Sequence, residues 1–239
     1  MAEAALPLPL PAAKPAKSGA EGHRQRLRQR LLDSDGAGMP DYEILELILF
    51  GAITRGDTKP LAKRLIKQFK DLSGVLNATE KDLAAIDGCG SGAIGAIRTA
   101  RVAGHRLLRQ EMLQADILAT EQAVLDYCGA TMGMEEIEHF RLIFLNVQNR
   151  VIGEEVQQRG TVNHTPVYTR EVVKSALDCH ASAVIMVHNH PSGNTTPSQA
   201  DIQMTRQVRD ALKAVDIVLH DHLIIARGDH LSFRAQRLL

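Results

Sequence analysis

The sequence lacks the features that mark several large classes of protein. Its three cysteines, Cys89, Cys128 and Cys179, lie far apart and form no CxxC pair, which argues against a disulfide framework and a thiolate zinc site. No run of about 18 apolar residues occurs, so no transmembrane helix is expected. The 28 basic and 28 acidic residues cancel, which excludes a uniformly basic nucleic-acid-binding protein. These absences favour a cytoplasmic protein with no membrane partner.

The balanced total hides two regions of opposite charge. Residues 1–110 contain 17 Lys and Arg against 12 Asp and Glu, whereas residues 111–239 contain 11 against 16. Eight of the ten histidines also lie in the second region. A chain of 239 residues is long enough for two small domains, and the asymmetry predicts two domains with different roles.

The first region reads as a tail followed by helices. Residues 1–20 are rich in alanine and proline, which predicts a disordered tail. Residues 21–108 repeat apolar side chains at helical spacing and show no strand pattern, so we predict a small all-α domain. The expected helix starts are at about Arg24, at Asp41 and Asp57 as N-caps, at Thr79 with Asp82, and after Gly92.

The second region, 117–239, alternates strand and helix patterns. This alternation predicts an α/β domain in which a sheet is flanked by helices. The expected elements are a strand at 140–147 with an antiparallel partner at 151–160, a helix capped by Thr169, a buried strand at 183–187, a helix at 198–215, and a hairpin of 217–226 with 231–233.

The polar residues that follow the buried strand carry the chemistry. His188 and His190 come directly after residues 183–187. If the chain stays extended, side chains at i and i+2 point to the same face, so the two imidazoles converge as a metal requires. Ser198 is a candidate N-cap, and Asp201 lies in the first turn of the helix that follows. Two histidines and one aspartate supply the three protein ligands of a catalytic zinc site and leave a fourth position for water.

A plain structural explanation of the same residues stays open from spacing alone. The two histidines can be ordinary residues at the end of a strand, and Asp201 can serve only as a capping-box residue. In that case the segment has no metal and no chemistry.

The longer pattern resembles a known family. His188-x-His190, seven residues, then Ser198-x-x-Asp201 is similar to the JAMM motif of MPN/JAB-domain metalloproteases. The string HNHPSGNTTPSQAD, with GTVNH before it and DHLII after it, resembles the RadC family of bacteria, and the likeness extends over 21–108 and 117–239. The resemblance implies an MPN/JAB-like mixed sheet, of the cytidine deaminase-like kind, preceded by a small helix-hairpin-helix-like domain.

The resemblance also implies roles for individual residues. His188, His190 and Asp201 become ligands of one Zn²⁺ per chain, and Ser198 hydrogen-bonds the oxyanion or the water. The implied activity is hydrolysis of a peptide or isopeptide bond in an unknown protein or peptide substrate, with a glutamate as general base. We choose Glu138 because it directly precedes the strand at 140–147. The other candidates are Glu135, Glu136, Glu154, Glu155 and Glu171.

The glycine-rich turn of the first region supports a different hypothesis. Gly88, Gly90 and Gly92 precede the long Ala- and Arg-rich helix, and such a turn can present backbone N–H groups to a DNA phosphate. Together with such non-specific DNA contact through 21–108, the resemblance to the RadC family implies, as the alternative function, a DNA-associated repair or recombination accessory protein with a structural or relict metal. The alternative is a glycine turn between packed helices.

Overall fold

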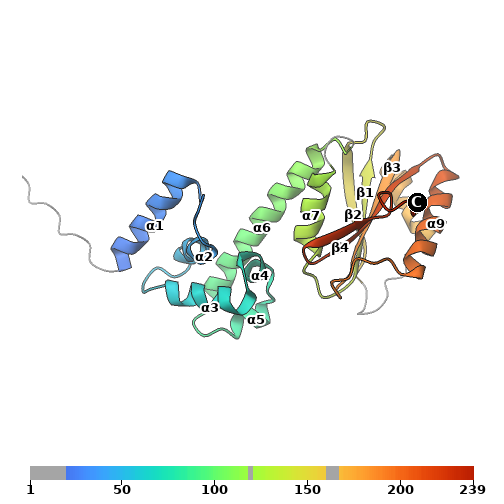
Figure 1. Cartoon of the computed structure of the whole chain (residues 1–239). Helices are drawn as coiled ribbons and strands as arrows, with labels where there is room; N and C mark the ends of the chain where they lie inside the picture. The colour runs from blue at the N-terminus through green and yellow to red at the C-terminus, as the bar shows by residue number, and fades with distance from the viewer. Residues whose placement is uncertain (1–19, 118–120, 160–166) are drawn as a thin grey trace, which may run out of the picture. The chain divides into compact units, whose positions relative to one another are not determined.

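The computed structural model describes residues 20–117, 121–159 and 167–239 (Figure 1). The chain divides into two compact units, Met1–Arg101 and Val102–Leu239, and the boundary falls within one long helix. Nearly all of the predicted tail, residues 1–19, lies outside the described residues. The domain limits at 20, 108 and 117 stay predictions.

The first unit is helical, as its apolar spacing predicts. Buried leucines from α2 and α3 pack with the apolar faces of the other helices around one core that includes Leu45, Leu49, Leu65 and Leu83. Among its described residues there is no strand, and no described helix of the whole chain is long and apolar enough to cross a lipid bilayer. Its helices are α1 Ala20–Ser34, α2 Asp41–Phe50, α3 Lys59–Phe69, α4 Leu72–Asn77, α5 Glu80–Ala84 and α6 Ser91–Gln114, which continues into the second unit.

Two of the predicted helix starts in this unit have different outcomes. Thr79 is the N-cap of α5, and its Oγ1 accepts a hydrogen bond from the Asp82 backbone N–H at 3.1 Å, as predicted. Asp41 is wrong as an N-cap, because Pro40 occupies that position in α2. The Asp41 carboxylate instead accepts the backbone N–H of Leu72 at 2.8 Å, so it ties α2 to α4.

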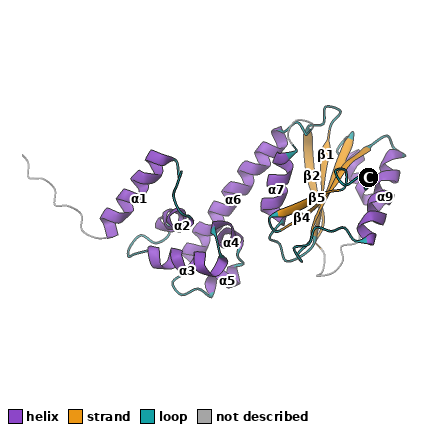
Figure 2. Ribbon diagram, viewed as in Figure 1, coloured by secondary structure: helices purple, strands orange, loops and turns teal. Residues whose placement is uncertain are grey.

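The second unit is built on one mixed sheet, whose strands are orange in Figure 2. The sheet has five strands in the order β2-β1-β3-β4-β5. The pairs are antiparallel except β3 with β4, which are parallel and joined through α9. The prediction of an antiparallel partner strand at 151–160 is confirmed for Val151–Arg159, and residue 160 lies outside the described residues. The strands are β1 His139–Leu145, β2 Val151–Arg159, β3 Ala183–Asn189, β4 Val218–Ala226 and β5 Asp229–Ser232.

Helices cover both faces of this sheet. Helix α7 (Gln122–Met132) packs on one face, where alternate residues of β1 and β3 form the first core. Helices α8 (Thr169–Asp178) and α9 (Gln199–Lys213) pack on the other face against the remaining alternate residues. Figure 1 shows α7 and α9 on opposite sides of the sheet. The predicted α/β class, a mixed sheet flanked by helices with a helical N-terminal region, is confirmed.

Two element boundaries differ from the prediction in ways that affect the site. The buried strand β3 does not end at Val187 but continues to Asn189, because β1 pairs with His188 and β4 pairs with both His188 and Asn189. Thr169 does not cap α8, whose N-cap is Tyr168 without a side-chain hydrogen bond. The longer β3 places His188 inside the sheet.

Candidate metal centre

The structure brings the three predicted metal ligands together. The two Nε2 atoms of His188 and His190 lie 2.9 Å apart, and the Asp201 carboxylate oxygens lie 3.6 Å and 3.7 Å from them. Four tetrahedral ligands at zinc-ligand distances stand about 3.4 Å from one another. The observed separations bracket that value, so the donor set fits a tetrahedral zinc. Within residues 20–117, 121–159 and 167–239, no other group of three His, Cys, Asp or Glu side chains has this spacing.

Strand β3 and the turn after it position the two imidazoles. His188 pairs with Phe140 of β1 and Ile224 of β4, and 1% of it is exposed. The backbone N–H of His190 donates to the Ile225 carbonyl at 2.8 Å, so the chain stays extended past the strand. The turn then closes through Gly193, whose φ of 82° favours glycine, and whose N–H donates to the His190 carbonyl. The two rings therefore lie on the same side, as alternation predicts.

Asp201 is held by the first turn of α9. Ser198 is the N-cap, and its Oγ accepts the Asp201 backbone N–H at 3.1 Å, as the capping-box pattern predicts. Asp201 Oδ2 in turn accepts the Ser198 backbone N–H and hydroxyl, both at 2.7 Å. These bonds fix the carboxylate with Oδ1 toward His188. The Ser198 hydroxyl is therefore engaged with Asp201, and its role toward an oxyanion stays a prediction.

The hydrogen bonds and the burial of the histidines suit a cation. Burial lowers the pKa of the His188 imidazole to about 4, although the Asp201 carboxylate acts in the opposite direction. His190 Nδ1 lies 2.6 Å from the Asn194 carbonyl oxygen, which can only accept, so Nδ1 carries a proton. His190 Nε2 then faces His188 Nε2 and the Asp201 carboxylate. A cation between these groups is favoured.

The lowered pKa of His188 predicts acid sensitivity of the metal-free protein. Between its ordinary value of 6.5 and about 4, the unfolded chain binds a proton that the folded chain does not. The contribution of His188 to the free energy of unfolding is therefore fully present above pH 6.5. It is lost as the pH falls to about 4, and the loss amounts to about 3 kcal/mol. Urea unfolding in chelator at several pH values measures the loss. His188→Gln is expected to flatten the profile over this range, and an unchanged slope would contradict the assignment.

The register of β1 indicates on which face of the sheet Glu138 lies. Glu138 directly precedes β1, in which Phe140 stands opposite His188. Continuing this antiparallel register places Glu138 opposite His190, and side-chain alternation puts it on the face of Phe140 and the ligand histidines. Of the six candidate glutamates, Glu138 is the one that the register carries to the metal ligands.

Glu154 belongs to the opposite face of the sheet. Its carboxylate accepts hydrogen bonds from Arg141 at 2.7 Å, Arg109 at 2.6 Å and the Tyr127 hydroxyl at 2.8 Å. These partners lie beside the core under α7. The sheet therefore separates this carboxylate from His188 and His190.

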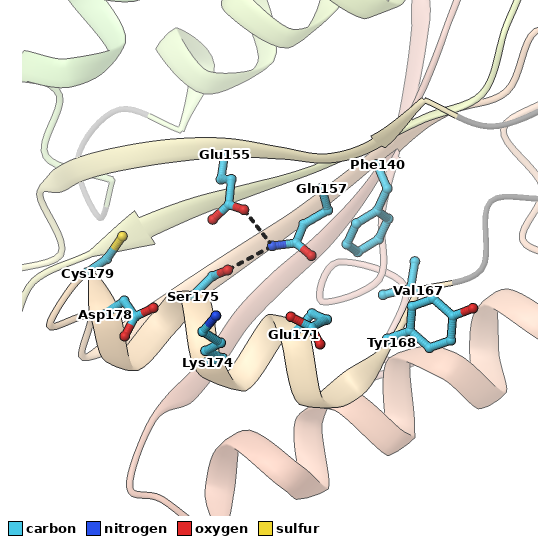
Figure 3. A pocket seen from close by; sticks show the side chains of 10 residues that line it. All are labelled: Phe140, Glu155, Gln157, Val167, Tyr168, Glu171, Lys174, Ser175, Asp178 and Cys179. Carbon is cyan, nitrogen blue, oxygen red and sulfur yellow. Dashed lines mark hydrogen bonds between the residues drawn. The ribbon is translucent and has the colours of Figure 1, made fainter.

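Glu155 and Glu171 line a groove between β2 and α8 (Figure 3). In this view Glu155 and Gln157 point from the strand toward the helix, and Gln157 Nε2 donates to the Glu155 carboxylate at 3.0 Å and the Ser175 hydroxyl at 2.9 Å. The groove has a volume of about 340 Å³ and shares Phe140 with the site, because Phe140 pairs with His188. The groove thus adjoins the metal centre on the same face of the sheet.

Sequence reasoning missed one buried residue that supports the site. Asn189 is 1% exposed and its side chain points away from the ligands. Its Oδ1 accepts the His139 backbone N–H at 2.7 Å, and its Nδ2 donates to the Ile137 carbonyl at 3.0 Å. These two bonds hold the backbone on either side of Glu138. The signal in the sequence is the position of Asn189 between the two histidines. A search for metal ligands alone overlooks this residue.

Of the predicted DNA-contact glycines, Gly88 and Gly90 lie in the turn before α6, and Gly92 lies in the first turn of α6 itself. Gly88 has a φ of 82°, and Cys89 N–H closes the turn on the Ile86 carbonyl at 2.9 Å. Gly88, Gly90 and Gly92 are exposed. Arg64 donates to the Asp87 carbonyl at 2.9 Å, so this nearby guanidinium already binds the turn itself. DNA contact through these residues stays a prediction.

Comparison with known proteins agrees with the site and the sheet. A family model described as the RadC-like JAB domain matches residues 118–238. The chain belongs to the RadC family. It is 48% identical over 217 residues to a UPF0758 protein of Ruegeria pomeroyi, and the match covers 91% of this chain and 97% of that protein. It is 51% identical over 213 residues to a UPF0758 protein of Rhodobacter capsulatus, covering 89% and 100%.

Family membership gives the second unit a coarse functional class. The RadC-like JAB domain has a hydrolase-like fold, and this RadC-family chain carries a His, His and Asp group that suits a metal at the end of β3. The matches cover nearly the whole length of both relatives, so the helical first unit is a shared part of these proteins.

Proposed function

We propose that this protein is a zinc-dependent hydrolase of peptide or isopeptide bonds. The observation that carries the proposal is the convergence of two imidazole Nε2 atoms and one carboxylate, from the end of β3 and the start of α9. Three protein donors leave one tetrahedral position open, which is typical of catalytic and not of structural zinc sites. A groove of about 340 Å³ lies on the same face of the sheet and is lined in part by Phe140, the partner of His188 in β1. The cytoplasmic location stays a prediction.

The protein's ligands prepare the centre for a metal without rearrangement. His190 keeps its Nε2 toward the centre because Nδ1 donates to the Asn194 carbonyl. Asp201 keeps its orientation because Ser198 binds one of its two oxygens. When bound, Zn²⁺ acts as a Lewis acid on a carbonyl and lowers the pKa of a water at the open position to about 7.

Proton transfer is assigned to Glu138. Its carboxylate accepts the proton of the attacking water and later returns it to the leaving amine. Asn189 fixes the backbone around Glu138, so the carboxylate keeps one approach to the centre. Ser198 contributes to the oxyanion only if its hydroxyl turns from Asp201 Oδ2 toward the substrate; as an oxyanion donor it would be worth roughly 2.7–4 kcal/mol.

The test combines metal analysis with a screen of peptide and isopeptide substrates. Protein purified without chelators is expected to hold about one zinc per chain, as three donors and an open position imply. Glu138→Gln is expected to keep this zinc and to lose roughly 10²–10⁴-fold in turnover, the usual range for a lost general base.

Two matched variants act as controls. Glu136→Gln changes an exposed carboxylate in the same segment, and Glu154→Gln changes the carboxylate behind the sheet. Both are expected to keep wild-type turnover at temperatures where the variants are folded. A zinc-free wild type contradicts the proposed function. Normal turnover by Glu138→Gln, or its loss in Glu154→Gln, contradicts the choice of base.

A further inference from the structure

A continuous row of buried polar groups lies behind His188, on the side away from the open position. His188 Nδ1 is 2.8 Å from His222 Nε2, and His222 Nδ1 is 2.6 Å from the Thr205 hydroxyl oxygen. That oxygen is 2.6 Å from the Asp201 backbone carbonyl. His222 and Thr205 are both fully buried, with 0% exposed. The row thus joins one proposed metal ligand to the backbone of another.

The direction of every hydrogen bond in this row follows from its last acceptor. A backbone carbonyl oxygen can only accept, so the single hydroxyl proton of Thr205 points to Asp201. Thr205 Oγ1 can then only accept from His222, which places the His222 proton on Nδ1. His222 Nε2 is left with a lone pair and accepts from His188 Nδ1. The remaining nitrogen of His188, Nε2, carries its lone pair toward His190 and Asp201.

The surroundings hold the His222 ring in place. It stacks on Phe233 with ring centroids 4.5 Å apart and meets the edge of Phe140 at 6.4 Å. Its backbone N–H donates to the preceding Asp221 carboxylate, which also accepts the Arg234 N–H at 2.9 Å and the Ser232 hydroxyl. Thr205 and Asp201 are four residues apart and stack on one face of α9. Neither end of the row can turn without breaking packed contacts.

We propose that Thr205 and His222 are positioning residues that fix the tautomer of His188, so that its Nε2 is permanently available to a metal. The proposal rests on the proposed function, since it concerns the same centre. Without the hydroxyl, His222 is free to carry its proton on Nε2 and donate it to His188 Nδ1. The His188 proton then moves to Nε2 and occupies the position that the metal needs. The partners behind metal-binding histidines commonly change metal affinity by 10–100-fold.

Thr205→Val tests this most directly, because valine has nearly the shape of threonine without the hydroxyl. We expect its zinc affinity, measured by competition with a chromogenic chelator, to fall by roughly 10–100-fold. Thr205→Ser keeps the hydroxyl and is expected to stay within about threefold of wild type. The second readout is ¹⁵N NMR of histidine-labelled, metal-free protein, which shows which ring nitrogen carries the proton. Wild type and Thr205→Ser are expected to show His188 and His222 protonated at Nδ1, and Thr205→Val to lose this state.

The two readouts separate the possible failures. Equal zinc affinity of Thr205→Val and wild type overturns the proposal, as does a wild-type His222 protonated at Nε2. If wild type binds no zinc, the proposed function fails, while the NMR of the metal-free protein still decides the tautomer. If Thr205→Val does not fold, the wild-type NMR decides the question: His222 protonated at Nδ1 supports the proposal, and His222 protonated at Nε2 overturns it.

Discussion

Asp201→Asn is expected to reduce zinc-dependent cleavage by roughly 10³-fold without unfolding the protein. The metal supplies several kcal/mol of transition-state stabilisation, and each 1.4 kcal/mol is tenfold in rate, so loss of the metal has an effect of about this size. Asparagine keeps an oxygen that can accept the Ser198 backbone N–H, so the helix start survives. The variant removes only the negative charge between the two imidazoles. Zinc content and turnover of the purified variant measure the effect.

Asp210→Asn is the matched control in the same helix. Its carboxylate is exposed and binds the neighbouring Arg209, so it touches neither the ligands nor the groove. Wild-type zinc content and turnover are expected. Full zinc content and full turnover in Asp201→Asn would exclude Asp201 as a ligand, whereas equal losses in both variants would point to damage to α9 in general.

Zinc is expected to raise the melting temperature of the second unit. A ligand that binds only the folded state at 100 times its Kd stabilises that state by about 2.7 kcal/mol. For a unit of this size, that corresponds to a rise of roughly 5–11 °C. The comparison is calorimetry in chelator against calorimetry with excess zinc. The shift comes from the ligands, because the fold already holds His188, His190 and Asp201 close together.

Asp201→Asn and Asp210→Asn again separate specific from general effects. Asp210→Asn is expected to show the full shift and Asp201→Asn to lose most of it. An equal shift in Asp201→Asn would mean that zinc binds at other histidines. No shift in wild type would contradict the proposed centre, whatever the outcome of a cleavage assay.

The parts of the site that sequence reasoning could predict are those fixed within a few residues of chain. The alternation of side chains in β3 and its extension puts His188 and His190 on one side, and a capping box spans only Ser198 to Asp201. The strands with apolar runs can be predicted for the same reason, because the pattern that marks them is local. The boundaries were less certain, because Asn189 belongs to β3 only through its pairing with Ile225 of a strand 36 residues later.

The parts that could not be predicted depend on contacts between distant segments. Asn189 binds a backbone group 50 residues earlier, and Thr205 contacts His222 from 17 residues away. The contrast between Glu154 and Glu155 is similar, because the face on which each lies depends on irregularities in the β1–β2 pairing. Neither charge nor local spacing reveals those register shifts. The prediction of Glu138 depends instead on a local feature, its place directly before the strand, and it stays a prediction.

The capping box has a consequence for reading other members of the family. Ser198 and Asp201 satisfy the first turn of α9 by themselves, and loss of such a cap costs about 1 kcal/mol whether or not a metal is present. Folding alone is therefore a sufficient reason for a chain to retain a serine and an aspartate at these two positions. A relative that no longer binds a metal can keep both residues unchanged. The paired histidines do not cap a helix. They are therefore the better indicator of whether a given relative still has a functional metal centre.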